Sequence, residues 1–197
     1  VRIKVIGVGG AGGNSLNDMI ESDIKNVEFV AANTDIQDLL KSKAKIKIHL
    51  GERITKGLGA GANHEIGKLA AEEDRDKIKA ILEDTEMVFI TAGMGGGTGT
   101  GAAPVIAKIA KEMGILTIAV VTKPFSFEGP KRKKNSITGI KDLSENIDTL
   151  VTIPNDKLFE LPNKDITLIN AFEEANKILK IGIKSIADLI TTQGFIN

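Results

Sequence analysis

One stretch of the sequence, Gly93 to Gly101, restricts the fold more than any other. It holds six glycines and two threonines in nine residues, and it directly follows the apolar run Met87 to Ile90. This pattern predicts a buried strand that leads into a loop with almost no side chains. Glycine lets backbone N–H groups approach a ligand closely, and a concavity of such groups binds anions. We therefore predict a phosphate-binding loop.

A helix is predicted directly after this loop, from Ala102 to Met113, because Val105, Ile106 and Ile109 recur on one face. The loop then points at the positive end of a helix dipole, which favours an anion by roughly 0.3–2 kcal/mol. A flexible glycine linker is the alternative. Linkers are not normally placed between a buried strand and an amphipathic helix, so the phosphate loop is the better interpretation.

The segment GGGTGTG, Gly95 to Gly101, resembles the signature of the tubulin and FtsZ superfamily. The other glycine-rich and turn loops resemble those of the bacterial FtsZ branch, and the resemblance covers the chain from Val1 to Asn197. It implies that residues 1–197 form a single GTP-binding domain. It also implies that the second, C-terminal domain of the family lies outside this chain.

Composition limits the kind of protein. Lys and Arg number 26, as do Asp and Glu, so no basic surface for nucleic acid is expected. The absence of cysteine excludes disulfides and thiolate metal sites. No signal peptide and no apolar run of about 18 residues is present, so we expect a soluble, cytoplasmic chain that does not insert into membranes.

Six short apolar runs alternate with helical patterns along the chain, which favours an α/β, Rossmann-like fold: a doubly wound, mainly parallel six-stranded sheet with helices on both faces. We expect the alternating run at 45–50 to be an edge strand and the very apolar run at 115–121 to be central. The predicted strands are Val1–Ile6, Val27–Ala32, Lys45–Leu50, Met87–Ile90, Ile115–Val121 and Leu150–Ile153.

The first glycine turn admits a second interpretation. Gly7, Gly9 and Gly12 satisfy G-x-G-x-x-G, the pattern of nicotinamide dinucleotide-binding domains. Such a domain usually has an acidic residue at the end of its second strand, whereas here Asn33 stands there, with Asp35 beyond it. No G-x-x-x-x-G-K-[ST] occurs, which disfavours a Walker-type NTPase.

Two other ligand-side segments remain open on residue chemistry alone. Asp35 either caps the short helix predicted at Ile36 to Leu40 or contacts a ligand. Gly57 to Asn63 is a second glycine-rich turn, typical of a mobile surface loop. The resemblance places this turn, including Gly61, near the terminal phosphate.

Glu128 and Arg132 stand four residues apart in a predicted helical segment. Taken alone, they form an exposed ion pair worth about 0.3–0.5 kcal/mol. The resemblance instead implies that Glu128 contacts the ribose and that Arg132 contacts the sugar and phosphates. We interpret the neighbouring Lys131, Lys133 and Lys134 as solvated surface.

The longest helix is predicted near the end of the chain, from Thr167 to Thr192. Phe172 and Asn176 share one face, where an aromatic ring and an amide could meet one planar ligand, although core packing is the simpler interpretation. The resemblance implies that they stack on guanine and bind its edge. Ile181 is an apolar residue on the otherwise polar side of this helix, so we expect another apolar surface to cover it. Asn170 stands where many family members carry Asp.

The resemblance implies a filament-forming GTPase of bacterial cell division, located at the division site and binding GTP or GDP with Mg²⁺. Head-to-tail self-association would bring an acidic loop, which would begin at Asn197, to the next subunit's nucleotide, so no complete catalytic group or metal site is expected in this chain. Cell-division proteins would be further partners. The alternatives are the nicotinamide-dependent oxidoreductase and a nucleotide-binding interaction module without hydrolysis. The expected nucleotide-binding residues are Gly10, Ala11, Gly12, Gly13, Asn14, Gly61, Gly93, Gly95, Gly96, Gly97, Thr98, Gly99, Glu128, Arg132, Phe172 and Asn176.

Overall fold

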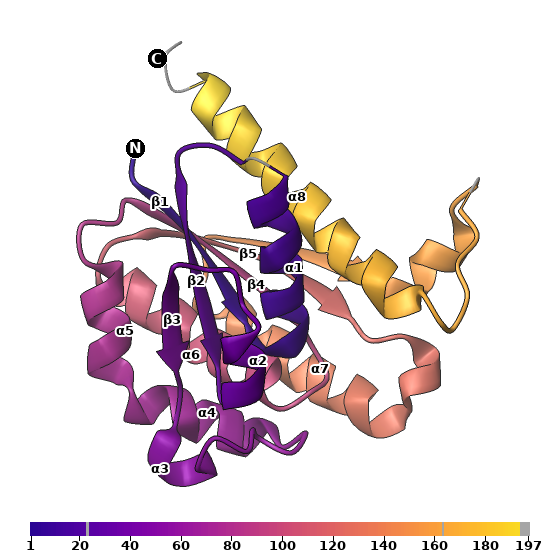
Figure 1. Cartoon of the computed structure of the whole chain (residues 1–197), viewed down its shortest axis with the longest axis horizontal. Coiled ribbons are helices and arrows are strands. Elements are labelled where there is room, and N and C mark those ends of the chain that lie inside the picture. Colours follow the sequence, from indigo (N-terminus) through magenta and orange to yellow (C-terminus); the bar gives the residue numbers. More distant parts are fainter. Residues whose placement is uncertain (23, 163, 194–197) are drawn as a thin grey trace.

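The computed structural model describes residues 1–22, 24–162 and 164–193 (Figure 1). Its strands are β1 (Ile3–Val8), β2 (Val27–Asn33), β3 (Ile46–His49), β4 (Met87–Gly93), β5 (Leu116–Lys123) and β6 (Thr149–Pro154). Its helices are α1 (Gly9–Glu21), α2 (Ile36–Leu40), α3 (Glu52–Thr55), α4 (His64–Glu73), α5 (Arg75–Leu82), α6 (Thr98–Glu112), α7 (Pro130–Ser144) and α8 (Ala171–Gln193), with the 3₁₀ turns η1 (Ser126–Glu128) and η2 (Asn155–Glu160).

The strands form a single sheet in the order β3-β2-β1-β4-β5-β6, and every pairing is parallel. The predicted fold class is therefore confirmed. The chain adds β2 and β3 on one side of β1 and then β4, β5 and β6 on the other, so the order of the strands reverses between the neighbours β1 and β4. In open α/β sheets a ligand binds beyond the carboxyl ends of the strands at such a reversal. Here the glycine-rich segments that follow β1 and β4 meet at that point.

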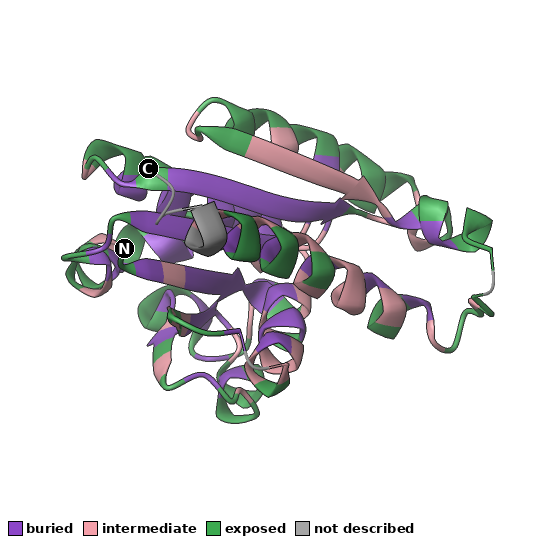
Figure 2. Cartoon of the chain, turned by 90° about the horizontal axis from the view of Figure 1, so that it is seen from above, coloured by how far each residue is buried: buried purple, intermediate pink, exposed green. Residues whose placement is uncertain are grey.

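Helices cover both faces of the sheet because its strands are apolar on both sides (Figure 1). One face packs against α1, α2 and α8, with Leu16, Met19, Leu179 and Ile183 in its core. The other face packs against α4, α5, α6 and α7 through a larger core. Figure 2 shows that burial is deepest in the strands between these layers.

Glycines bring three of these helices into near contact. A Cβ atom added at Gly101 of α6 would lie 2.0 Å from the backbone oxygen of His64, where α4 begins. One added at Gly67 of α4 would lie 2.3 Å from the Gly97 oxygen, and one at Gly139 of α7 would lie 2.5 Å from a methyl carbon of Thr100. Side chains at these positions would force the helices apart, so α4, α6 and α7 depend on glycine to pack together.

Two expectations about strand position have different outcomes. The 45–50 run is the edge strand β3, as predicted. The 115–121 run is not central: β5 lies next to the edge strand β6, and β1 and β4 form the centre. β5 is apolar because α6 and α8 lie over its two faces, not because it lies in the middle of the sheet.

Three predicted boundaries were wrong. Gly7 lies inside β1, where it pairs with Ala31, so the first turn starts two residues later. α6 begins at Thr98, inside the glycine segment, because small residues with no side-chain clash can enter the first turn. α8 begins at Ala171, which leaves Leu168 exposed in the turn before the helix.

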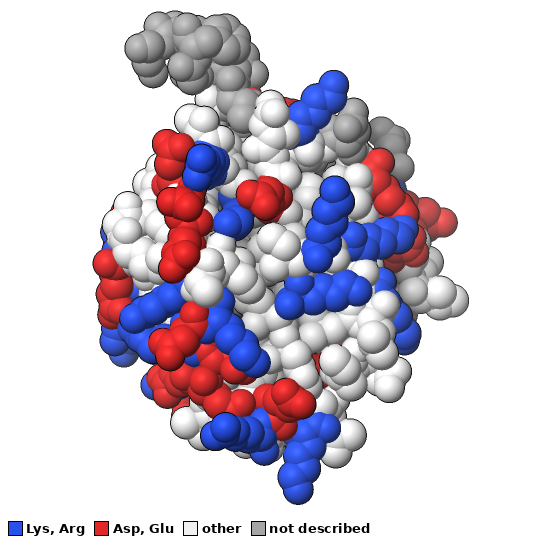
Figure 3. Space-filling view, turned by 60° about the vertical axis from the view of Figure 1, so that its left-hand side comes forward, with Lys and Arg blue, Asp and Glu red and all other residues white. Residues whose placement is uncertain are grey.

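The surface agrees with the balanced composition. On the face shown in Figure 3, cationic and anionic side chains are interspersed, with no patch of a single sign over the whole face. Among the described residues, no helix has both the length and the apolar character needed to cross a bilayer. Ile181 of α8 is half exposed, which agrees with its predicted position on the polar side of the helix.

Candidate functional site

A cavity of about 510 Å³ lies at the carboxyl ends of the strands, where β1 and β4 meet. The β1–α1 turn and the β4–α6 loop form one wall, and residues 33–35 at the end of β2 together with the second glycine turn at 58–62 form another. Residues after β5 and β6, and the first turns of α8, complete the lining. Segments spread over most of the sequence therefore share one concave site.

The helices that open into this cavity differ in how their N-termini are capped. Asp35 caps α2 by accepting hydrogen bonds from Gln37 N (2.8 Å) and Asp38 N (3.4 Å), and Asn63 caps α4. Within the described part of the chain, no side chain caps the longer helices α1 and α6. The first N–H groups of a helix need an acceptor, and an anion supplies one while it gains from the dipole. The two uncapped ends therefore present N–H groups that an anion in the cavity could accept from.

Most of the predicted glycines line this cavity. Gly10, Gly61, Gly93, Gly96, Gly97 and Gly99 all do so, as do the neighbouring predicted residues Ala11 and Thr98. The space around them differs, however. A Cβ atom at Gly96 would meet only the Arg132 guanidinium, at 3.5 Å, whereas one at Gly97 would lie 2.7 Å from the Ala60 methyl carbon and 3.0 Å from Asn63 N. Gly97 therefore serves loop packing as well as the cavity.

Four predicted residues lie outside the lining. Gly12 packs against β4, where an added Cβ atom would lie 2.5 Å from the Thr91 oxygen, so it brings α1 close to the sheet. Gly13 and Asn14 line a separate hollow of about 40 Å³. The N–H of Gly95 donates to Thr100 Oγ1 at 2.8 Å, which shapes the loop from behind.

Hydroxyl groups link the two walls of the cavity. Thr34 Oγ1 and Thr98 Oγ1 lie 2.6 Å apart and share a hydrogen bond, although 64 residues separate them. The backbone oxygen of Thr34 also accepts from Thr55 Oγ1, at 3.3 Å. We did not predict Thr34 as a site residue. Its position after a buried strand, directly before the capping Asp35, was the signal that could have found it.

Glu128 and Arg132 both line the cavity. Glu128 belongs to η1 and not to α7, yet its Oε1 lies 4.0 Å from Arg132 Nη1, and its Oε2 accepts from Phe125 N at 2.7 Å. Burial raises the pKa of Glu128 above its ordinary 4.5, although the Phe125 amide and Arg132 oppose this shift. The carboxylate is thus held in a partly dry position beside a cation.

The far end of the cavity is aromatic and amide-rich. Phe172 and Asn176 of α8 both line it, and the Phe172 ring, 49% exposed, lies edge-on to Phe125 at 5.5 Å. Asn155, directly after β6, is 5% exposed, and its Oδ1 has no hydrogen-bond partner among the residues that the structure describes. A buried amide oxygen without a partner is costly unless a ligand supplies a donor. Asn155 was not among the residues predicted from the sequence.

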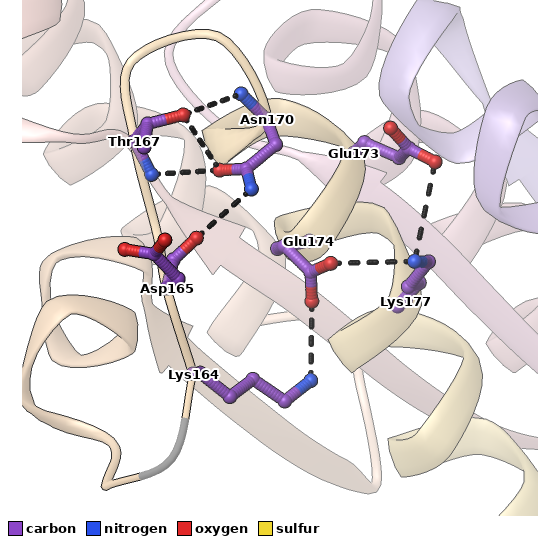
Figure 4. Close-up of polar contacts among 7 residues, drawn as sticks. All are labelled: Lys164, Asp165, Thr167, Asn170, Glu173, Glu174 and Lys177. Atoms are coloured by element: carbon purple, nitrogen blue, oxygen red, sulfur yellow. Dashed lines mark hydrogen bonds and ion pairs between the residues drawn. The ribbon is translucent and has the colours of Figure 1, made fainter.

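A polar cluster fixes the start of α8, which carries Phe172 (Figure 4). Asn170 Oδ1 accepts from Thr167 N at 2.7 Å, and its Nδ2 donates to the Asp165 oxygen at 3.0 Å. An aspartate could not make the second bond. Glu174 accepts from Lys164 at 3.1 Å, and this hydrogen bond is the main cause of its lowered pKa. Asn170 therefore orients the helix from outside the cavity.

No group of three or more His, Cys, Asp or Glu that could hold a metal occurs among the described residues. Three carboxylates line the cavity: Asp35, Asp38 and Glu128. Asp35 caps α2 and Glu128 accepts from a backbone amide, whereas the Asp38 carboxylate has no hydrogen-bond partner within residues 1–22, 24–162 and 164–193. Mg²⁺ is usually bound by one or two carboxylates plus ligand phosphates, and Asp38 fits that requirement.

Comparison with known proteins agrees with this geometry. The family model "Tubulin/FtsZ family, GTPase domain" matches residues 2–163. The "Cell division protein FtsZ" of Coxiella burnetii is 59% identical over 196 residues, which is 100% of this chain and 51% of that protein. The chain thus spans about half the length of the curated relatives it matches.

Solved structures agree as well. An empty FtsZ dimer from M. jannaschii superposes with a TM-score of 0.93 at 49% identity, covering 96% of this chain and 55% of that one. A GTPgS-bound protofilament of CetZ2 from Haloferax volcanii gives 0.82 at 25% identity, covering 95% and 58%. The match to a GTPase domain over most of the chain disfavours the nicotinamide alternative. This chain belongs to the Tubulin/FtsZ family, whose GTPase domain matches residues 2–163.

Proposed function

We propose that this chain binds GTP and GDP in the 510 Å³ cavity as the nucleotide-binding part of a filament-forming GTPase of cell division. The observation that carries the proposal is the pair of uncapped N-termini of α1 and α6, which face one cavity at the reversal of the sheet. The phosphates would accept hydrogen bonds from the backbone of Gly10, Ala11 and Gly96 to Gly99.

The remaining lining residues suit the sugar, the base and the ion. Glu128 and Arg132 would contact the ribose and the nearer phosphate. Phe172 would pack against the guanine, while Asn176 and the unpaired Asn155 Oδ1 would bind polar groups of the nucleoside. Bound Mg²⁺ would neutralise charge on the phosphates, with Asp38 as its protein ligand.

The proposal extends to assembly. Head-to-tail stacking of copies, with an acidic loop of one subunit reaching the nucleotide of the next, would complete the active site and convert GTP to GDP and phosphate. Such heterologous contacts build filaments when the rotation between subunits does not close a ring. The assembled protein would act at the division site in the cytoplasm with other cell-division proteins. The M. jannaschii dimer and the H. volcanii protofilament are precedents for self-association within the family.

The test is to identify the nucleotide that the purified protein releases when it is denatured. We expect GDP or GTP by anion-exchange chromatography, in an amount comparable to the protein. Protein that is emptied and then incubated with equal GTP, ATP and NAD should retain GTP. Release of NAD, or no retention of any nucleotide after reloading, would contradict the proposal.

Base recognition gives a first quantitative prediction. Asn176→Leu removes a polar group that faces the cavity, and leaving a polar group of the base unpaired costs about 1–3 kcal/mol, so the preference for GTP over ATP should fall by that amount. Phe172→Ala should weaken GTP and ATP alike. Competition binding measures both effects. Phe159→Ala, in the same aromatic cluster but outside the cavity lining, is the control and should change neither affinity.

The hydroxyl pair gives a second prediction. Thr34→Val keeps the shape of a fully buried side chain but removes the hydrogen bond to Thr98, which lines the phosphate end of the cavity. One such bond contributes about 0.5–1.5 kcal/mol, and GTP affinity measured by calorimetry should fall by a similar free energy. Thr138→Val on the exposed side of α7 should have no effect. Equal affinities in the two variants would show that Thr34 does not position Thr98.

A further inference from the structure

A second concave site lies between α7 and the carboxyl ends of β5 and β6, and we call it the α7 groove. Its volume is about 480 Å³. It adjoins the nucleotide cavity at Pro124, which lines both. Apolar side chains and lysines dominate its lining: Phe125, Ile137 and Ile140, with Lys123, Lys133 and Lys141.

The apolar part of the α7 groove is open to solvent. Ile137 is 63% exposed although it lies in a concave lining, and Ile140 is partly buried beneath it. An exposed apolar residue on a convex surface needs no explanation, but one inside a groove provides a place where a partner's apolar side chain can leave water. The groove therefore favours an occupant with at least one apolar anchor.

The cationic residues at the start of α7 destabilise the helix. Lys131, Arg132, Lys133 and Lys134 fill its first turns, where the dipole disfavours cations, and no acidic residue stands there. Arg132 is used in the nucleotide cavity. Lys123 and Lys141 form no ion pair with any residue that the structure describes. Lys133 is thus kept in the lining at a local cost to the helix, and Lys123 and Lys141 lie beside it without acidic partners, so the lining favours an anionic occupant.

One acidic residue, Asp156, also lines the α7 groove. Its carboxylate accepts from Ser126 N at 2.9 Å and from the Ser126 hydroxyl, and these bonds are the main cause of its lowered pKa. The nearby Lys133 acts in the same direction. Asp156 is therefore engaged within the chain, and two lysines of the lining remain without an acidic partner.

The edge of the sheet beside the groove is also unpaired. β6 pairs only with β5 in the described sheet, and Thr149–Pro154 contains no charged residue. Figure 2 colours this strand as partly exposed along nearly all its length. Natural edge strands usually carry charges or are covered, and an uncovered edge can hydrogen-bond an added extended chain. This feature favours a polypeptide over a lipid surface, which is flat and cannot extend a sheet.

We propose that the α7 groove docks an extended acidic segment of a partner protein. An apolar side chain of the segment would cover Ile137, its carboxylates would lie on Lys123, Lys133 and Lys141, and its backbone would pair with the free edge of β6. This interaction is independent of the proposed nucleotide binding, because the residues that carry it lie outside the nucleotide cavity.

The test is fluorescence anisotropy with a labelled octapeptide, DELLIDEE, and the nucleotide-loaded chain. We expect saturable binding that weakens as salt rises, because exposed charge pairs are screened. The double variant Lys133→Glu with Lys141→Glu should weaken binding at least about tenfold. Ile137→Ser should weaken binding while leaving the salt dependence unchanged. Hydrogen exchange should show new protection of the β6 amides when the peptide is bound.

The matched control is Lys131→Glu with Lys134→Glu, which makes the same charge change on the same helix outside the lining. It should alter affinity by less than about twofold. Thermal unfolding checks that each variant is folded, and Lys133→Arg with Lys141→Arg should retain binding. No binding of DELLIDEE, or equal weakening by both charge reversals, would overturn the proposal. So would binding of phosphatidylglycerol vesicles that depends on Lys133 and Lys141 without any binding of the peptide.

Discussion

Residues 1–197 alone will bind GTP but release phosphate only at a residual rate, and the rate will rise on the order of 10²- to 10⁴-fold when the missing water-activating group is supplied. The carboxylates of the cavity explain the low rate. Asp35 and Glu128 hold backbone amides, and Asp38 fits a role as ligand to the ion. No carboxylate in the cavity is thus left over to act as a general base.

The assay is steady-state phosphate release at micromolar protein, with and without the second-half polypeptide of the C. burnetii relative. GTP affinity measured in parallel shows that the nucleotide site is intact. Asp38→Asn distinguishes a role of Asp38 as ligand to Mg²⁺ from a role as general base. Loss of an ion ligand should reduce the dependence of binding on Mg²⁺. Robust turnover by residues 1–197 alone, abolished by Asp38→Asn, would show that the base lies inside this chain and that the proposed completion in trans is wrong.

A side chain at Gly96 will weaken nucleotide binding strongly while leaving the fold intact. Gly96 lines the cavity, and a Cβ atom there would contact only the Arg132 guanidinium, so Gly96→Val would place its methyl groups where the phosphates are expected. Overpacking of this kind typically costs about 1–3 kcal/mol, or roughly 5- to 150-fold in affinity. Folding should change little because no backbone atom lies in the way.

Gly13→Ala is the control for this prediction. An added Cβ atom there has nothing within 4 Å, and the residue lies outside the cavity although it belongs to the same type of glycine-rich turn. Calorimetric titration with GTP and thermal unfolding should be measured on both variants. Gly97→Val is less informative, because its side chain would meet Ala60 and Asn63 and disturb the loop itself. Unchanged GTP affinity in Gly96→Val would refute the phosphate position.

Much of this architecture could be predicted from local patterns. Six apolar runs separated by helical periodicity determined the number of strands, and a polar alternation identified β3 as an edge. The position of β5 could not be derived in this way, because strand order depends on which side each crossover takes and not on how apolar a strand is. The break between α4 and α5 at Asp74 also lies inside a single periodic pattern.

The site shows a similar division. Phe172 and Asn176 were predicted as ligand contacts from the family resemblance, since their spacing alone favoured core packing, and both line the cavity. Asn155 and Thr34 were missed because the features that mark them, an unpaired buried oxygen and a hydrogen bond across 64 residues, exist only after folding. The glycine-rich runs located the loops, but the role of a single glycine could not be predicted, since glycine gives the same signal in a ligand loop and in a helix contact.

The glycine contacts among α4, α6 and α7 bear on how such a chain can drift in evolution. A lineage that abandoned its nucleotide would be free to fill Gly10 and Gly96, where an added Cβ atom would meet only a side chain at ordinary contact distance. It would still have to keep Gly67, Gly101 and Gly139, because any larger residue there collides with a neighbouring helix. Glycines at the last three positions thus record ancestry of the fold, whereas glycines at the first two record continued use of the ligand.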